Sequence, residues 1–499
     1  MGGVNTLLLK VGPSPSWTET GKMRPLLGIV LLAVFSLSCA MGPDYSRPDI
    51  ETADRFRMSD TEGESIANLP WWELLHDEEL QRLIERALIN NKNLKQAVAN
   101  IEEFQARLFT ARTDFIPQAD MNMNAPVLGR LKGFTAPGFA TPFAYFGQGN
   151  LNWELDIWGR IRRSTEAARA DLMAREENRR AVVLQLVSGV AQLYFDLLQF
   201  DMQFVIAKRT LLSWEESVNI ARARLRRGVT SRLDADQFEA ERANAAARVA
   251  ELERQMVQKE NALSVLLGNN PVPIPRGRGL TEQVLPPEVP AGLPSELLQR
   301  RPDILQAEQA LVAATARIGA TKAARFPRLS ITGLLGVASP QLSNLLNGGN
   351  EFGQAGLGLA GPVLNAESLG FEQRAVEAQA KQVLAQYEQT ILVAFQEVED
   401  ALVAVRTVGT QRKAQEDQVT ALRSALHLAN LRYKGGITSY IDVLIAKRNL
   451  FDAELALTDT HRLHLVSVVQ LYKALGGGWS PTDSPSLAAS PSLSRHLSQ

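Results

Sequence analysis

Two short segments of similar sequence carry carboxylates within them or just beyond their ends. Residues 228–234 read GVTSRLD and residues 436–442 read GITSYID. The carboxylates in or just beyond these segments are Asp234, Asp236 and Asp442. If several copies of the chain surrounded an axis, these carboxylates would form rings that favour cations and that close by charge pairing. The alternative is that they stabilise the N-termini of the helices in which they lie.

Other arrangements that could carry chemistry have less support. His461 and His464 are three residues apart on one predicted helix, but with five His and one Cys in the chain we expect no metal site. The sequence GLGLAG at 356–361 fits GxGxxG, yet Pro362 follows it and no βαβ pattern surrounds it, so we do not expect a dinucleotide site. We therefore expect no enzyme and no cofactor.

Composition excludes further classes of function. The chain has 499 residues, with 53 Lys and Arg against 54 Asp and Glu, so its formal net charge is −1. This balance gives no electrostatic reason to bind nucleic acid. Hydrophobic residues make up 45% of the chain, which is close to an ordinary globular protein and too low for a polytopic helical membrane protein.

The N-terminus has the layout of a secretory signal. Residues 25–38 are apolar and uncharged, and they are too few for a span of about 20 residues. Lys22 and Arg24 precede them and Cys39 follows. Met23 would make a better start than Met1. The arrangement resembles a bacterial lipoprotein signal, which predicts a signal peptide over 1–38 and lipidation of Cys39; an anchor helix and an unmodified Cys are the alternatives.

The rest of the chain is predicted to be an ancient duplication. Besides the two matching segments, which are offset by 208 residues, Pro117 and Pro327 lie in similar surroundings. We predict a first repeat over 39–268, a connector rich in Pro and Gly over 269–294, a second repeat over 295–479 and a disordered tail over 480–499.

Within each repeat the pattern predicts a helix, two strands, a very long helix, a turn and a return helix. The predicted helices are 77–114, 159–227, 231–267, 295–325, 367–434 and 439–475. The predicted strands are 119–127, 148–157, 329–337 and 352–363. Each long helix would measure about 100 Å and therefore needs partners of similar length. We expect two shorter helices, placed end to end, to match each long one.

The predicted strands indicate that several copies of the chain assemble. In residues 148–157 polar and apolar side chains alternate strictly, with Trp153 on the apolar side and Trp158 just after the strand. That alternation, and lengths near 10 residues, suit a transmembrane barrel with aromatic residues at the membrane interface. Four strands cannot close, and open edges are not tolerated in lipid, so two, three or four chains would have to combine. Surface hairpins of a soluble protein are the alternative.

Several stretches together resemble the TolC-like outer-membrane efflux proteins, specifically the NodT-type lipoprotein branch. Any one of them is weak, but they occur in order and cover most of residues 39–479. They are GPDYSRP at 42–48, Trp71-Trp72, ELDIWGRIRR at 154–163, RPDI at 301–304, RYKGGITSYIDVL at 432–444 and ALGGGW at 474–479.

The resemblance implies a mostly α-helical homotrimer: a 12-stranded β-barrel in the outer membrane, continued by a long α-helical barrel across the periplasm. It implies a passive conduit in a tripartite efflux system, with a periplasmic membrane-fusion adaptor and an inner-membrane RND-type pump. Arg448 would belong to the periplasmic gate, paired with Asp234 or Asp442. The predicted adaptor contacts are Arg226, Arg227, Gly228, Ser231, Lys434, Gly435, Gly436 and Ser439. An outer-membrane channel for type I protein secretion is the alternative function, and a lipid-anchored coiled-coil scaffold is the other class.

Overall fold

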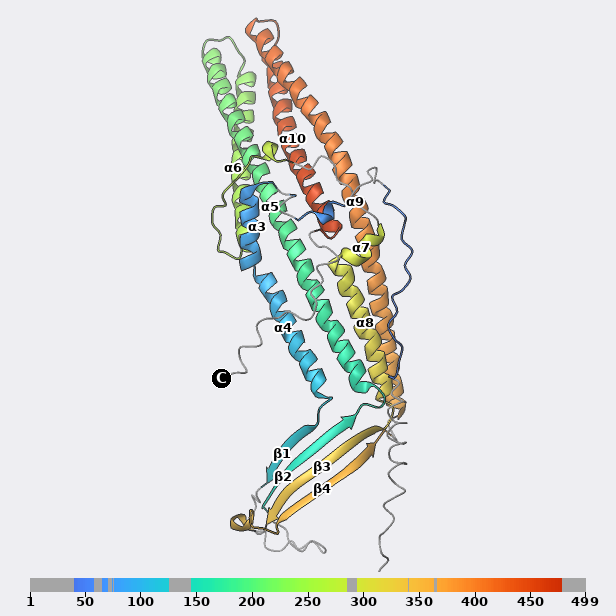
Figure 1. Cartoon of the computed structure of the whole chain (residues 1–499). Helices are drawn as coiled ribbons and strands as arrows, with labels where there is room; N and C mark the ends of the chain where they lie inside the picture. Colours follow the sequence, from blue (N-terminus) through green and yellow to red (C-terminus); the bar gives the residue numbers. More distant parts are fainter. Residues whose placement is uncertain are drawn as a thin grey trace, which may run out of the picture. The chain divides into compact units, whose positions relative to one another are not determined.

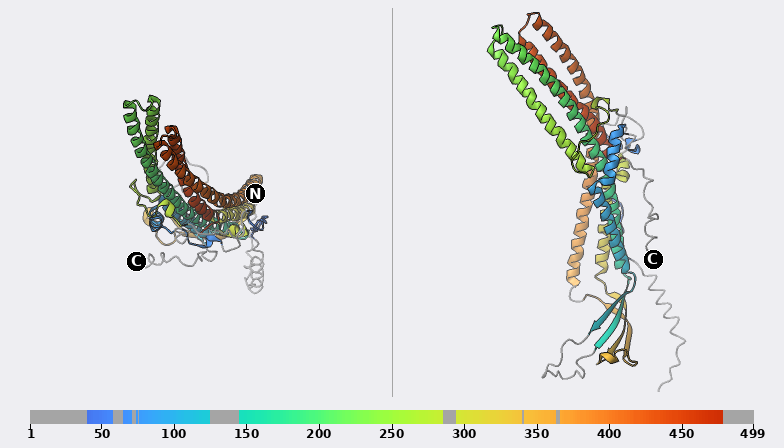
Figure 2. Two further views of the ribbon diagram at one scale, coloured as in Figure 1. Left: turned by 90° about the horizontal axis from the view of Figure 1, so that it is seen from above. Right: turned by 90° about the vertical axis from the view of Figure 1, so that its left-hand side faces the viewer.

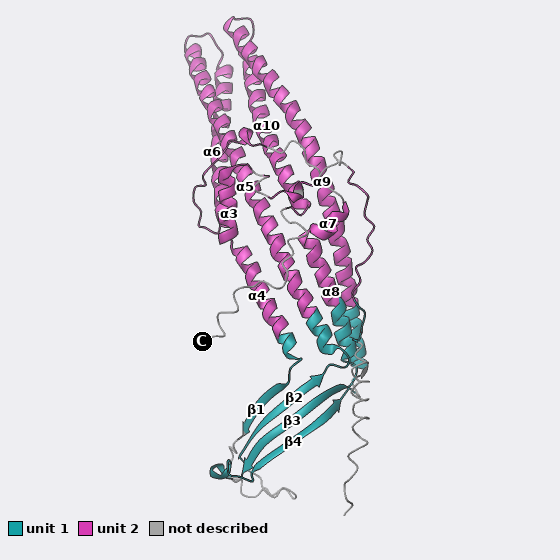
Figure 3. Cartoon of the chain, in the orientation of Figure 1, with its two compact units in different colours: residues 1–44, 110–166, 315–377 teal, residues 45–109, 167–314, 378–499 magenta. Residues whose placement is uncertain are grey.

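The computed structural model describes residues 40–57, 65–70, 74, 76–124, 145–284, 294–339, 341–362 and 366–477. These residues form two compact units (Figure 3). Among the described residues, unit 1 contains 40–44, 110–124, 145–166 and 315–362 apart from 340, together with 366–377. Unit 2 contains most of the helical residues. The signal peptide, Cys39, Trp71, Trp72 and the tail lie outside the described residues.

Unit 1 is built on one antiparallel sheet of four strands in the order β1-β2-β3-β4 (Figure 1). The strands are β1 (Gln118–Asn124), β2 (Tyr145–Leu155), β3 (Arg328–Ser339) and β4 (Glu351–Ala360). The four predicted strands are confirmed, with shifted ends, while residues 125–127 and 363 lie outside the described residues. The segment with the GxGxxG pattern belongs almost entirely to β4, as expected from its surroundings.

The register divides the sheet into a polar and an apolar face. Asp120 is opposite Asn150, and one residue along, Ala119 is opposite Leu151, because side chains alternate along each strand. The polar face carries Asp120, Asn122, Gln148, Asn152, Glu154 and Thr332. The apolar face carries Met121, Leu151, Trp153, Ile331, Leu335 and Leu357. Leu335 is 75% exposed and Leu357 74% exposed, so the described part of the chain leaves much of the apolar face open.

Unit 2 consists mainly of helices, several of which extend into unit 1. The helices are α3 (Glu78–Asn90), α4 (Lys92–Thr113), α5 (Arg160–Arg226), α6 (Arg232–Leu266), α7 (Pro294–Arg300), α8 (Pro302–Ala323), α9 (Ala366–Lys434) and α10 (Tyr440–Ala474). Seen from above, the helices of unit 2 follow an arc (Figure 2). In the described part of the chain, α5 alone has an apolar window long enough to cross a bilayer, and 61% of that window is buried inside the protein. We therefore interpret α5 as a core helix.

The two halves build the same elements, and three pairs of matching helices have nearly the same lengths. Helices α6 and α10 have 35 residues each, α4 and α8 have 22 each, and α5 and α9 have 67 and 69. The turn after each long helix contains a glycine in the left-handed region, Gly228 at φ +69° and Gly436 at φ +71°. This conformation is costly for residues with a Cβ, which explains why glycine ends both long helices.

The single helices predicted over 77–114 and 295–325 are wrong, because each is broken once, at positions that match between the halves. Asn91 is extended (ψ 131°) and its side chain accepts from the Leu94 amide at 3.0 Å, so it starts a new helix. In the second half, α7 ends at Arg300 and α8 begins at Pro302, a residue that favours the first helical position.

At each break, a side chain forms a hydrogen bond with the last residue of the return helix of the same half, which is α6 in the first half and α10 in the second. The Asn91 side chain donates to the carbonyl of Leu266, the last residue of α6, at 2.9 Å. Arg301 donates to the carbonyl of Ala474, the last residue of α10, at 2.9 Å. Helix ends leave such carbonyls without a partner in the helix. The predicted end-to-end arrangement of the shorter helices is therefore confirmed: α6 meets the start of α4, and α10 meets the start of α8.

Helix α3 is fixed on the core of unit 2 by its apolar face and by a buried carboxylate. Leu80, Leu83 and Ile84 lie on one face of the helix and are fully buried in the core of unit 2, with residues of α5 and α10. Asp77, 1% exposed, caps the helix by accepting from the amides of Glu79 at 2.9 Å and Leu80 at 3.2 Å. Its second oxygen accepts from the Tyr194 hydroxyl (3.1 Å), the Arg278 amide (3.0 Å) and the Gln283 side chain (2.8 Å).

Candidate functional site

The two turns that join the long helices to the return helices present exposed residues of matching type. Residues 227–231 join α5 to α6, and residues 435–439 join α9 to α10. Val229 is 70% exposed and Ile437 71% exposed, and a Cβ on Gly228 or Gly436 would meet no atom within 4 Å. These turns contain or border the predicted adaptor contacts, whose role stays a prediction.

The first predicted gate carboxylates make contacts within their own turn and helix. Ser231 and Asp234 form a capping box: the Asp234 amide donates to the Ser231 hydroxyl at 3.1 Å, and the Ser231 amide donates to the Asp234 carboxylate at 3.3 Å. The hydroxyls of Ser231 and Thr230 hold the pKa of Asp234 below its usual range. Asp236 pairs with Arg232 at 3.6 Å, one turn away. Helix stabilisation, the alternative reading, thus describes what Asp234 does within one chain.

The second predicted gate pair is not brought together inside one chain. Asp442 and Arg448 are both exposed near the start of α10. Within the described residues, Arg448 forms no ion pair with Asp234 or Asp442 in the same chain. Ser439 occupies the position before α10 without a side-chain capping bond. A gate built from these residues would have to form between chains, and it stays a prediction.

A cluster that the sequence did not predict joins the two helical hairpins, α5–α6 and α9–α10. Trp214, Phe238 and Leu444 are buried in it, and Tyr440 packs on Phe238 with ring centroids 4.1 Å apart. Arg224 of α5 lies over the ring of Tyr433 of α9 and donates to its hydroxyl. Sequence reasoning missed this cluster because its members are up to 230 positions apart and match no motif.

Lys447 of α10 forms the polar part of this contact. Its ammonium group donates to the hydroxyls of Ser213 and Ser217 of α5, at 2.9 Å each, and lies 4.9 Å from the centre of the Trp214 ring. Burial lowers the pKa of Lys447, opposed by the negative charge of Glu216. Burial also raises the pKa of Tyr440 to about 12.

In unit 1, both predicted interface tryptophans lie at one end of the sheet. The indole of Trp153 donates to the carbonyl of Phe115 at 2.9 Å, and that of Trp158 donates to the carbonyl of Pro327 at 2.8 Å. Trp158 also stacks on Phe326, with centroids 4.8 Å apart. Each indole N–H is thus paired with a backbone carbonyl, and the membrane-interface role of the two tryptophans stays a prediction.

The segment that follows Cys39 is held beside Trp158. The Met41 amide donates to the Trp158 carbonyl at 3.0 Å, and Arg163 donates to the Met41 carbonyl at 3.1 Å and to Asp44 at 2.6 Å. A Cβ on Gly159 would lie 2.8 Å from the Cα of Ala40, so glycine permits this close approach. Cys39 itself lies outside the described residues.

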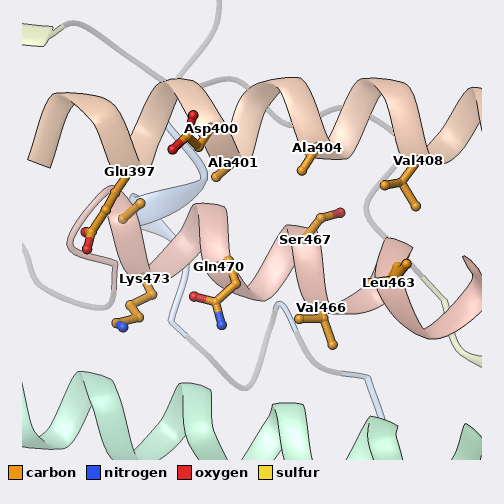
Figure 4. Close-up of a pocket in the computed structure, with 11 residues that line it drawn as sticks. Glu397, Asp400, Ala401, Ala404, Val408, Leu463, Val466, Ser467, Gln470 and Lys473 are labelled. Atoms are coloured by element: carbon orange, nitrogen blue, oxygen red, sulfur yellow. The ribbon is translucent and has the colours of Figure 1, made fainter. Parts of the chain in front are cut away.

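A groove of about 360 Å³ runs between α9 and α10 (Figure 4). Ala401 and Ala404 of α9 and Ser467 of α10 are among the residues that line it. Nowhere in the described ranges do three or more His, Cys, Asp or Glu residues gather as a metal site would require.

Comparison with known families decides the identity. The family model described as "Outer membrane efflux protein" matches residues 83–269 and 293–477. The chain belongs to the outer membrane efflux protein family. It is the outer-membrane component of an efflux system, and the predicted resemblance and function are confirmed.

Similar proteins span nearly the whole chain. It is 35% identical over 466 residues to the probable efflux pump outer membrane protein TtgC of Pseudomonas putida, covering 91% of this chain and 96% of that protein. It is 33% identical to the cation efflux system protein CusC of Escherichia coli K12, over 90% of this chain and 98% of that one. The open state of the MtrE outer membrane channel of Neisseria gonorrhoeae superposes with a TM-score of 0.79 at 32% identity, over 88% of this chain and 98% of that one. The predicted fold class, mostly helical with a small sheet and an internal repeat, is thereby confirmed.

Proposed function

We propose that three copies of this chain close a 12-stranded β-barrel in the outer membrane and continue it as an α-helical tunnel through the periplasm. The observation that carries the proposal is the two-faced sheet of unit 1. Its apolar face suits lipid and its polar face suits a water-filled lumen. Within the described strands, β1 and β4 are its edges, and in lipid such edges must pair with another chain.

The long helices support the tunnel. Helices α5 and α9 would each span about 100 Å, and the joined pairs α6–α4 and α10–α8 extend beside them. The curved row of helices in unit 2 is suited to form part of the wall of a larger tube (Figure 2). Three such rows would complete it.

The turns at 227–231 and 435–439 would form the periplasmic mouth, where a membrane-fusion adaptor docks and links the channel to an inner-membrane RND-type pump. Their matched exposed residues, Val229 and Ile437, support a contact made twice per chain. Asp234, Asp236, Asp442 and Arg448 would act there as a gate between chains. The pump would supply the energy, and the channel would be a passive conduit.

A lipid on Cys39 would anchor each chain in the outer membrane. The contacts of Ala40 and Met41 support this, because they hold the two residues that follow Cys39 in the sequence beside a predicted interface tryptophan, Trp158, or its neighbour Gly159. Trp153 lies at the same end of the sheet.

In this proposal the inner-membrane pump selects the compound that is transported. The similar proteins are named for toluene, solvents, antibiotics and cations. A lumen that serves such different compounds needs no specific binding site. No observation on this chain favours type I protein secretion over efflux.

The test is the mass of the purified full-length protein in detergent, measured by light scattering, with single-channel conductance in planar bilayers on the same sample. We expect a trimer with low resting conductance that increases in the Asp234→Ala and Asp442→Ala variants. A monomer that never conducts would overturn the proposal and favour a lipid-anchored scaffold.

A further inference from the structure

The loop that joins β3 to β4 exposes two large apolar side chains at one end of the sheet in unit 1. The structure describes residues 341–350 of this loop, which contain the short helix η3 (Leu342–Asn344). Leu342 is 63% exposed and Leu346 is 85% exposed, a fraction higher than those of Leu335 and Leu357 on the apolar face of the sheet. Covering these two leucines with an apolar medium would be favourable.

The loop and the strand before it carry no charge. Residues 329–350 contain no Lys, Arg, Asp or Glu. Charged side chains resist transfer out of water, so a charged loop would hold the end of the hairpin away from lipid. The polar residues at 341–350 are Ser, Asn and Gln, and their hydrogen bonds decide whether the loop can approach lipid.

The amide side chains of the loop are paired with one another. The Asn344 side chain donates to that of Gln341 at 3.1 Å and accepts from that of Asn347 at 3.1 Å. The Asn344 carbonyl accepts from the Asn350 side chain at 2.5 Å, and the Asn350 carbonyl accepts from the Ala338 amide at 3.0 Å. Polar groups next to hydrocarbon must find their partners within the protein. These groups meet that condition, and the same bonds hold the backbone that carries the two leucines.

The register of the sheet places the loop at the opposite end of the apolar face from Trp153. Tyr145 lies on the same face of β2, eight residues before Trp153 (145 to 153), and is opposite Ser339, the last residue of β3. At about 3.3 Å per residue the two aromatic residues are about 27 Å apart along the strand, or about 20 Å in height for a strand tilted by about 40°. The apolar band of a transmembrane barrel is about 25 Å tall. If Trp153 marks one edge of that band, Tyr145 and the loop just beyond it lie at the other.

Lipid is the cover that fits this position. In the proposed function, lipid covers the face of the sheet that ends at Tyr145 and Ser339, and the loop continues directly from that end. A water-filled lumen would leave both leucines hydrated, so turning them toward it would gain nothing.

We propose that the loop 341–350 inserts Leu342 and Leu346 among the lipid acyl chains at the outer edge of the bilayer. The loop thereby fixes the depth of the barrel in the membrane from the end opposite to Trp153. This inference rests on the proposed function, because it takes the apolar face of the sheet to contact lipid.

Spin labels on single cysteines test where the loop lies. The full-length protein is placed in vesicles of phosphatidylethanolamine and phosphatidylglycerol, and each label reports its accessibility to oxygen, which concentrates in lipid, and to a water-soluble nickel chelate. The test variants are Leu342→Cys and Leu346→Cys. Leu357→Cys on the apolar face is the lipid reference, and Val229→Cys, at a position 70% exposed in the turn after α5, is the water reference. Cys39 is the only native Cys, and the unsubstituted protein measures any label that it takes.

We expect the ratio of oxygen to nickel accessibility at both leucine positions to exceed that at Val229 at least about fivefold, because oxygen is apolar and the chelate is polar. A smaller difference at either position overturns the inference, since the leucine then faces water. Protection of either label from both reagents also overturns it, because protein then covers the loop. If Leu357→Cys gives the same ratio as Val229→Cys, the sheet is not in lipid and the proposed function fails. A lipid-exposed Leu357 beside water-exposed loop positions refutes the inference alone.

Discussion

The substitution Asp77→Asn tests how the first half of the chain is attached to the core of unit 2. The carboxylate accepts five hydrogen bonds, two on one oxygen and three on the other. An amide has one oxygen and one NH₂ group. In either orientation, at least two N–H or O–H donors would face another donor. A buried donor without an acceptor costs about 1–3 kcal/mol, so we expect a loss of at least about 2 kcal/mol.

Hydrogen exchange of the full-length protein is the suitable assay, since local opening can be followed in a membrane protein whose global unfolding is not two-state. A loss of 2 kcal/mol corresponds to exchange about 30-fold faster at the Arg278 amide and in the first turn of α3. Ser231→Ala removes one cap at an exposed helix start and should cost about 1 kcal/mol, confined to α6. Exchange at Arg278 within threefold of the parent would refute the reasoning.

Three further predictions concern the helical unit. Burial and the nearby Arg412 lower the pKa of His461 and His464, so the packed pair α9–α10 binds protons less readily than separated helices. The stability of the packed pair should therefore fall as the pH drops from about 6.5 through the lowered pKa values, although the negative charge of Glu416 opposes the shift at His461. Replacing both histidines with Gln should abolish this pH dependence, which melting curves between pH 5 and 7.5 would show. Glu454→Gln should lower the free energy of unfolding by about 1–2 kcal/mol. This is less than the loss expected on breaking a fully buried ion pair, because the partners Arg209 and Arg423 are 60% and 61% exposed. An unchanged melting temperature would contradict this. Gly228→Ala and Gly436→Ala should each cost about 1–2 kcal/mol from backbone strain alone, and markedly unequal losses by thermal melting would argue against that origin.

Local patterns predicted the elements well, because apolar periodicity, Pro and Gly act within a few residues. The four strands, both long helices and the Gly228 and Gly436 turns follow from such signals. The breaks at Asn91 and Arg301 were missed. Pro302 indicates that a helix starts directly after Arg301, and the repeat would then have predicted a matching break near Asn91 in the first half.

The contacts that join distant segments could not be predicted in this way. Lys447 and Ser213 belong to different halves, and nothing in the sequence near either residue indicates the other. Asp77 looks like an ordinary helix cap, while three of its five partners come from residues 194–283. Such pairs are determined by how the helices pack, which periodicity alone leaves open.

The joints at Asn91 and Arg301 limit how the length of the helical unit can change during evolution. Each joint aligns the end of a return helix with a fixed residue, so α5 cannot lengthen unless α6 or α4 lengthens by the same rise. The equal lengths of α6 and α10 extend this condition to the second half. A longer or shorter variant therefore needs coordinated insertions or deletions in both halves, and a single indel within one of these helices would leave the two turns at unequal heights.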